Sequence, residues 1–217
     1  MANAAKVKVW DIWTRLFHWS LAGLIAFAWW SVENHHLDWH KIAGSVIAGL
    51  LVFRLWWGVF GGSTARFADF VKGPGAIFSY LGGKKPVTLG HNPLGALSVL
   101  ALLLSCAAVV GFGLFASDTD GLESGPFASQ VNYDQSVLAG TLHGYAFEAV
   151  KWLVVLHLLA IAYYAMIKRE PLLGSMIHGQ KPATEGDRTL KPAGILSTLI
   201  GLALGAATTW ALIKFGG

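Results

Sequence analysis

Histidine is the residue type whose spacing in this sequence points most directly to chemistry. Four of the eight histidines lie in or beside long apolar stretches: His18, His40, His143 and His157. His143 and His157 are 14 residues apart, which on an α-helix is about 1400°, or about 40° short of four turns. We therefore expect both imidazoles on nearly the same helix face, roughly 21 Å apart along the axis.

Each histidine of this helix has a counterpart at a similar depth on another predicted helix. His18 lies eight residues from Trp10 and His157 eleven residues from Lys168, both measured from the inner side, which is roughly 12–16 Å along a helix. His40 and His143 both lie toward the opposite end. The sequence thus predicts two pairs, His18 with His157 and His40 with His143.

Two imidazoles that face each other at one depth are typical axial ligands of a haem iron. A tetrahedral zinc site would need more ligands at one place than either pair offers. Small residues near the histidines would let a flat cofactor lie close to a helix, although they would equally serve helix packing. They are Ala22, Ala26, Gly44, Ala48, Gly140 and Gly144.

Basic residues are expected beside the carboxylates of such a cofactor. Arg15, Arg54 and Lys151 are expected near the ends of the predicted spans and are candidate partners of haem propionates. The alternative is that each one is an anchor whose charge reaches the membrane surface. His91 and His178 fall in connections, where we expect ordinary loop residues or, because imidazole titrates near neutral pH, proton carriers.

Composition places these histidines in a membrane. Of the 217 residues, 54% are hydrophobic and 13% are charged, which is about half the charged share of a soluble domain. This excludes a disordered chain, a nucleic-acid-binding tail and a secreted disulfide scaffold. The single cysteine, Cys106, excludes an internal disulfide and a four-cysteine zinc or iron–sulfur site within this chain. No CxxCH motif for covalent haem attachment occurs.

Five apolar stretches are long enough to cross a membrane, which needs roughly 20 residues each. They cover about residues 10–30, 39–60, 93–116, 138–167 and 194–213. We therefore predict an all-α integral membrane helical bundle in lipid. Residues 1–182 would form a four-helix di-haem core, and residues 183–217 a linker and an additional helix. Gly201 and Gly205 would dock that helix to a partner or to a second copy in a homodimer, or the helix would be a lipid-facing anchor.

The charged residues in the connections between the spans predict how the chain is oriented in the membrane. One side carries basic residues in three segments: Lys6, Lys8 and Arg15; Arg54, Arg66, Lys72, Lys84 and Lys85; Lys168, Arg169, Lys181, Arg188 and Lys191. The other side carries Glu33, Asp38, Asp118, Asp120, Glu123 and Asp134, with Lys41 at its edge. The positive-inside rule puts the N-terminus in the cytoplasm and the C-terminus in the periplasm. The segment 67–81 mixes apolar and basic residues and is expected to lie on the inner surface.

Several motifs resemble those of bacterial di-haem b-type cytochromes. These are the cytochrome b subunits of nickel–iron hydrogenases and formate dehydrogenases, and the small bacterial b561-type cytochromes. The motifs are VWDIWTRLFHW, DWHKIAGSVIAGLLVFRLWWG, ARFADFVKGP, GHNPLGAL, LHGYAFEAVKWLVVLHLLAIAYY and MIHGQKP, and they span residues 7–182. The resemblance implies a four-helix bundle in the bacterial inner membrane, with two non-covalent haem b groups on His18, His40, His143 and His157. The fifth stretch departs from that four-helix form.

The resemblance also implies electron transfer between a membrane quinone and a redox partner, often periplasmic. The partner would be a c-type cytochrome, a hydrogenase subunit or a dehydrogenase subunit, and the acidic outer loop suits a basic one. One alternative is an enzyme acting alone, which passes electrons from superoxide or another small reactant to quinone. A second alternative, from a different class, is a transporter or scaffold subunit without redox chemistry.

Overall fold

Five long helices dominate the part of the chain that the computed structural model describes, namely residues 6–84, 89–118, 123–183 and 189–215. They are α1 (Ile12–Glu33), α2 (Leu37–Phe60), α5 (Pro93–Phe115), α6 (Tyr133–Tyr163) and α8 (Ile195–Phe215). Their bounds agree with the apolar stretches to within a few residues. Of the charged residues used for the orientation, Lys85, Asp120 and Arg188 lie outside the described residues.

Local sequence explains where these helices begin and end. Helix α6 starts five residues before the expected position because Asn132 and Gln135 form a capping box at its first turn. Its far end continues as a π-helical turn, η2 (Tyr164–Lys168), and stops at Arg169, whose φ of 57° is left-handed. Helix α5 begins with a proline at its first turn behind the capping residue Asn92.

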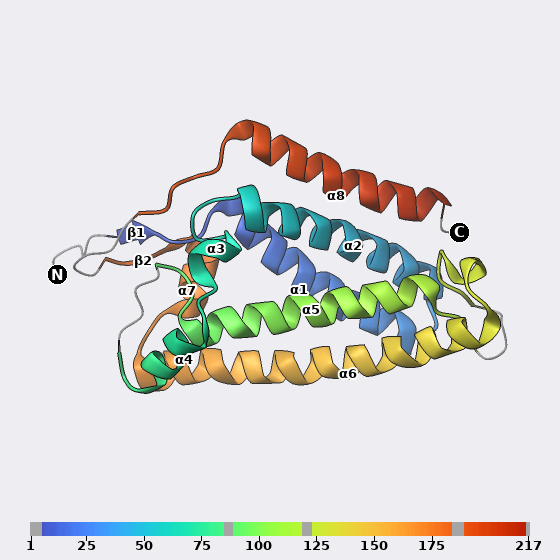
Figure 1. Cartoon of the computed structure of the whole chain (residues 1–217), viewed down its shortest axis with the longest axis horizontal. Coiled ribbons are helices and arrows are strands. Elements are labelled where there is room, and N and C mark those ends of the chain that lie inside the picture. The colour runs from blue at the N-terminus through green and yellow to red at the C-terminus, as the bar shows by residue number, and fades with distance from the viewer. Residues whose placement is uncertain (1–5, 85–88, 119–122, 184–188, 216–217) are drawn as a thin grey trace.

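Four of the long helices form two antiparallel pairs, α1 with α2 and α5 with α6, that face each other (Figure 1). Buried apolar side chains from all four helices meet between the pairs, namely Ala28, Ala43, Ile47, Leu51, Cys106 and Val150. A second cluster toward one end contains Phe17, Phe53, Trp57 and Ala65. The expected all-α four-helix arrangement is therefore present, and Cys106 lies buried in it.

Helix α8 lies along α2, on the side away from α5 and α6 (Figure 1). Gly205 approaches α2 so closely that a Cβ there would be 2.9 Å from the carbonyl oxygen of Gly49. A Cβ at Gly201 would be 2.7 Å from the ring of Trp56, whose indole N–H donates to the Ser197 carbonyl at 2.8 Å. The two glycines thus dock α8 within its own chain.

Four of the described helices are long and apolar enough to cross a membrane: α2, α5, α6 with η2, and α8. The chain is accordingly a multi-pass membrane protein. Helix α1, which we also expected to span, has 22 residues but does not meet the same criterion of length and composition. Its polar residues, among them Arg15, His18 and Glu33, lower its mean hydropathy.

Short elements close the end that we call inner, following the predicted orientation. Strand β1 (Lys6–Lys8) pairs antiparallel with β2 (Gln180–Pro182) next to α7 (Leu172–His178), a pairing that the sequence analysis did not predict. The surface segment expected over residues 67–81 forms two short helices, α3 (Phe67–Phe70) and α4 (Pro74–Leu81). The opposite, outer end carries the one-turn helix η1 (Ala128–Gln130).

Candidate functional site: two histidine pairs

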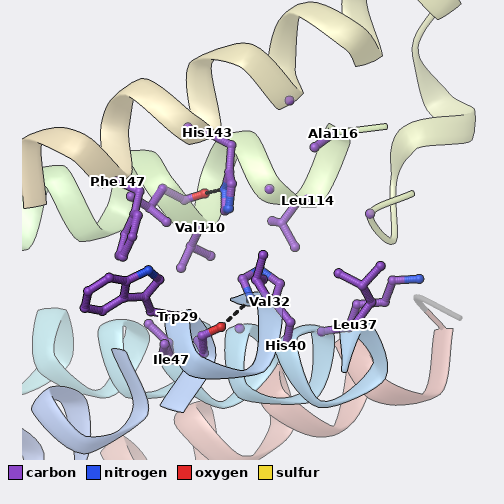
Figure 2. A pocket seen from close by; sticks show the side chains of 18 of the residues that line it. Trp29, Val32, Leu37, His40, Ile47, Val110, Leu114, Ala116, His143 and Phe147 are labelled. Carbon is purple, nitrogen blue, oxygen red and sulfur yellow. Dashed lines mark hydrogen bonds between the residues drawn. The ribbon is translucent and has the colours of Figure 1, made fainter. Parts of the chain in front are cut away.

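The outer pair joins the start of α2 to α6. The ring centroids of His40 and His143 are 5.9 Å apart, and Figure 2 shows both side chains directed into one pocket. His40 Nδ1 lies 3.0 Å from the Ala28 carbonyl oxygen, and His143 Nδ1 lies 2.7 Å from that of Val109. Carbonyl oxygens only accept, so Nδ1 is assigned as the N–H donor in both rings, which leaves both Nε2 lone pairs for a metal.

The inner pair joins α1 to α6. The ring centroids of His18 and His157 are 6.3 Å apart, with 48° between the ring planes. His18 Nδ1 is buried, and no hydrogen-bond partner for it is found among the described residues. The structure thus brings the four histidines together in the two predicted pairs.

The spacing within each pair fits one metal ion between two rings. A metal about 2 Å from one nitrogen of each ring, with each ring centre roughly 1 Å further, puts the centroids about 6 Å apart. The observed separations are 5.9 and 6.3 Å. In the described parts of the chain, no group of three or more His, Cys, Asp or Glu side chains is placed to hold a metal ion. Each pair therefore suits a metal whose remaining ligands come from a macrocycle.

A cavity of about 680 Å³ surrounds the outer pair and is lined by α1, α2, α5, α6 and the outer loop. Its size lies within the ~300–1,000 Å³ of small-molecule and cofactor sites. Gly44 and Gly144 border the cavity, and a Cβ on either would meet no described atom within 4 Å. A Cβ at Gly113 would instead be 2.9 Å from the His143 ring. Gly44 and Gly144 leave room for a ligand, whereas Gly113 lets two helices approach.

Arg54 supplies a buried positive charge near the inner pair. Its residue is only 3% exposed, and its guanidinium carbon lies 4.7 Å from the ring centroid of Phe67 and 6.0 Å from that of Phe17. Within the described ranges, Nη1 has no hydrogen-bond partner, and the nearby carboxylate of Asp11 contributes electrostatic attraction only. A buried guanidinium with a spare N–H favours an additional anionic acceptor.

His91 belongs to the same neighbourhood, although an ordinary loop residue or a proton carrier was expected from the sequence. Its ring lies 4.6 Å from the ring of Trp10 and 4.6 Å from that of Phe70. Burial, followed by the positive charges of Arg54 and His157, lowers the pKa of His91 to about 3. The imidazole is therefore neutral at pH 7. Its position just before the helix cap Asn92, in the motif GHNP, was the available signal.

The other two expected basic partners lie in different surroundings. Arg15 is at the inner surface, where Nη1 donates to the Ile177 carbonyl at 2.6 Å and ties α1 to α7. Lys151 was expected near the end of a span but lies in the body of α6, paired with Glu148 at 2.6 Å. Of these three residues, Arg54 alone is buried.

One comparison with known proteins identifies a family. A family model described as prokaryotic cytochrome b561 matches residues 9–179. The match covers most of the chain, includes all four paired histidines and ends before α8. No match was found among curated proteins or among solved structures.

Proposed function

The chain belongs to the prokaryotic cytochrome b561 family, and on this premise we propose that it is a di-haem cytochrome that links a membrane quinone to a periplasmic redox partner. Membership makes it a membrane b-type cytochrome that binds haem b and transfers electrons. The observation that carries the di-haem proposal is the presence of two histidine pairs with matching ring separations, 5.9 and 6.3 Å, at two depths.

The residues present fit two such groups. His40 and His143 would hold one haem and His18 and His157 the other, and each haem supplies a reversible one-electron couple when bound. The backbone carbonyls that accept from His40 and His143 fix the ring orientation and raise the basicity of Nε2. Gly44 and Gly144 leave space in the wall of the outer cavity.

Arg54 supports the inner site by charge. Its unpartnered, buried N–H would donate to a propionate, and the positive charge would favour the anionic form of that carboxylate. The apolar side chains around it, Phe17 and Phe67, exclude water and strengthen this attraction. Lys151 is a weaker candidate for the same role because it already pairs with Glu148. Arg15 donates through Nη1 to the Ile177 carbonyl, but its buried Nε has no hydrogen-bond partner among the described residues, so Arg15 stays a candidate.

The proposed orientation puts the N-terminus in the cytoplasm, with α1 as a fifth span and the C-terminus in the periplasm. Carboxylates from Glu33, Asp118 and Glu123 line the outer cavity at its mouth, together with Lys41. This excess of negative charge favours a basic protein such as a c-type cytochrome over a small anion such as superoxide. Helix α2 covers the face of α8 that contains Gly201 and Gly205, so a homodimer would need another face of α8.

Haem extraction and a reduced-minus-oxidised spectrum of the purified protein test this proposal. We expect two non-covalent b haems per chain in the unaltered protein. His143→Ala and His157→Ala should each lose a different one, because the two residues belong to different pairs. A folded but colourless protein would contradict the proposal and favour the transporter or scaffold alternative.

A further inference from the structure

An ion pair of α6 lies near the middle of the predicted membrane. At the inner end, the side chain of Asn92, which caps α5, donates to the hydroxyl of Tyr164 at 2.8 Å. Toward the outer end, Val109 of α5 accepts from His143 at 2.7 Å. These two contacts between antiparallel helices place the middle of α5 beside residues 148–152 of α6. Glu148 and Lys151 are therefore within about one helical turn of the bilayer centre.

The ion pair lines the inward part of the cavity that surrounds the outer histidines. Glu148 and Lys151 are 2.6 Å apart, and their side chains keep 56% and 38% of their surface exposed. Lys151 Nζ also lies 5.9 Å from the ring centroid of Trp29 and 5.5 Å from that of Phe147. Figure 2 shows Trp29 and Phe147 together at one end of the pocket, away from Leu37 and Ala116. Charged groups at this depth are costly and usually serve a ligand pathway or a proton pathway.

The charge balance at the inward part of the cavity indicates the kind of ligand that would bind there. The carboxylate of Glu148 already neutralises the ammonium of Lys151, so a second carboxylate, such as a haem propionate, would add an unbalanced negative charge. A neutral molecule that accepts a hydrogen bond fits better. The rings of Trp29 and Phe147, 6.2 Å apart, would contact a flat unsaturated ring.

Resting on the cytochrome function proposed above, we propose that Trp29, Phe147, Glu148 and Lys151 bind the headgroup of a membrane quinone. Lys151 would donate to a quinone carbonyl oxygen, while Glu148 would accept from a hydroxyl of the quinol. The headgroup would lie beside the outer histidine pair because both share one cavity. A quinone dissolved in the bilayer interior would thus reach these side chains without leaving the membrane.

Quinone binding by the purified, haem-loaded protein tests this site. A benzoquinone with a single isoprene unit is titrated into the unaltered protein, Lys151→Met, Glu148→Gln and Phe147→Leu. Lys214→Met is the matched control, because Lys214 lies outside this cavity and its Nζ is likewise near two aromatic rings, 4.9 Å from the centroid of Trp210 and 5.7 Å from that of Phe215. Haem content and the reduced-minus-oxidised spectrum are recorded for every variant. The initial rate of reduction by the corresponding quinol is measured alongside.

We expect Lys151→Met to raise the quinone Kd about tenfold to a hundredfold, as loss of a charged hydrogen bond does, with haem content unchanged. Glu148→Gln should slow reduction by quinol at least about tenfold, as loss of a proton acceptor does. Lys214→Met should stay within about twofold of the unaltered protein. Equal quinone Kd values in all variants would overturn the site and leave the di-haem function standing. Loss of haem in Lys151→Met would overturn it as well, since Lys151 would then support the haem. Should that variant not fold, Phe147→Leu decides by the same Kd criterion.

Discussion

Replacing Arg54 by methionine is expected to have opposite effects on the protein without and with its cofactor. Methionine keeps most of the length of the side chain and removes the charge. In the free protein, Arg54 is 3% exposed and no described residue accepts from its Nη1. Removing this incompletely partnered buried charge should leave the fold equally stable or stabilise it by about 1–4 kcal/mol, as the replacement of buried ion pairs by hydrophobic residues does.

With the cofactor bound, the same change removes the expected partner of a buried carboxylate. Breaking a buried charge pair from one side costs about 3–5 kcal/mol, and each 1.4 kcal/mol is a factor of about ten in affinity. The inner haem should therefore bind at least about a hundredfold more weakly in Arg54→Met. The outer haem should be unaffected because its cavity does not include Arg54.

The assay compares Tm values of haem-depleted protein and rates of haem transfer to an acceptor protein from haem-loaded protein. Arg66→Met is the control, because Arg66 pairs with Asp69 at 2.9 Å on the exposed surface, where such pairs contribute about 0–1 kcal/mol. We expect Arg54→Met to keep or raise Tm without haem and to speed the loss of one haem of the two. A lower Tm without haem, together with unchanged haem transfer, would refute the reasoning.

Three further predictions follow from the packing of glycines and from the orientation. Gly144→Leu should place its side chain in the outer cavity and lower the haem content from two to about one per chain. Gly111→Leu, on α5 outside that cavity, should keep both haems. Equal haem loss in the two variants would contradict the assigned cavity. Gly205→Ile should separate α8 from α2 and destabilise the protein by about 1–3 kcal/mol in thermal unfolding, because even a Cβ there lies 2.9 Å from the Gly49 carbonyl oxygen. An unchanged Tm would show that α8 packs differently. A phosphatase that is active only in the periplasm should be active when fused after Gly217 and inactive when fused before Met1, and the reverse result would invert the orientation.

The sequence predicted the histidine pairs because helical geometry is regular. The 14-residue step on one continuous helix sets both the direction and the separation of His143 and His157. Apolar length sets the depth of His18 and His40 in a membrane of fixed thickness. Given these two constraints, few pairings are possible, and the structure has the predicted one.

Other features depend on contacts that spacing does not reveal. The position of Arg54 inside an aromatic cluster follows from Phe67, which a connection brings back to α2. The burial of His91 likewise depends on Trp10 and Phe70, which come from two different segments. Strands β1 and β2 are three residues each and pair across most of the chain length, so no local pattern predicts them. The glycines of α8 indicated close packing but not the partner helix.

A potentiometric titration of the protein in lipid nanodiscs, followed by visible absorbance, tests the central claim most directly. Two b haems held by His18 with His157 and by His40 with His143 predict two one-electron steps in the unaltered protein. His40→Ala and His143→Ala should both abolish one and the same step, while His18→Ala and His157→Ala should both abolish the other. A single step in the unaltered protein, or the loss of different steps in His40→Ala and His143→Ala, would contradict the pairing.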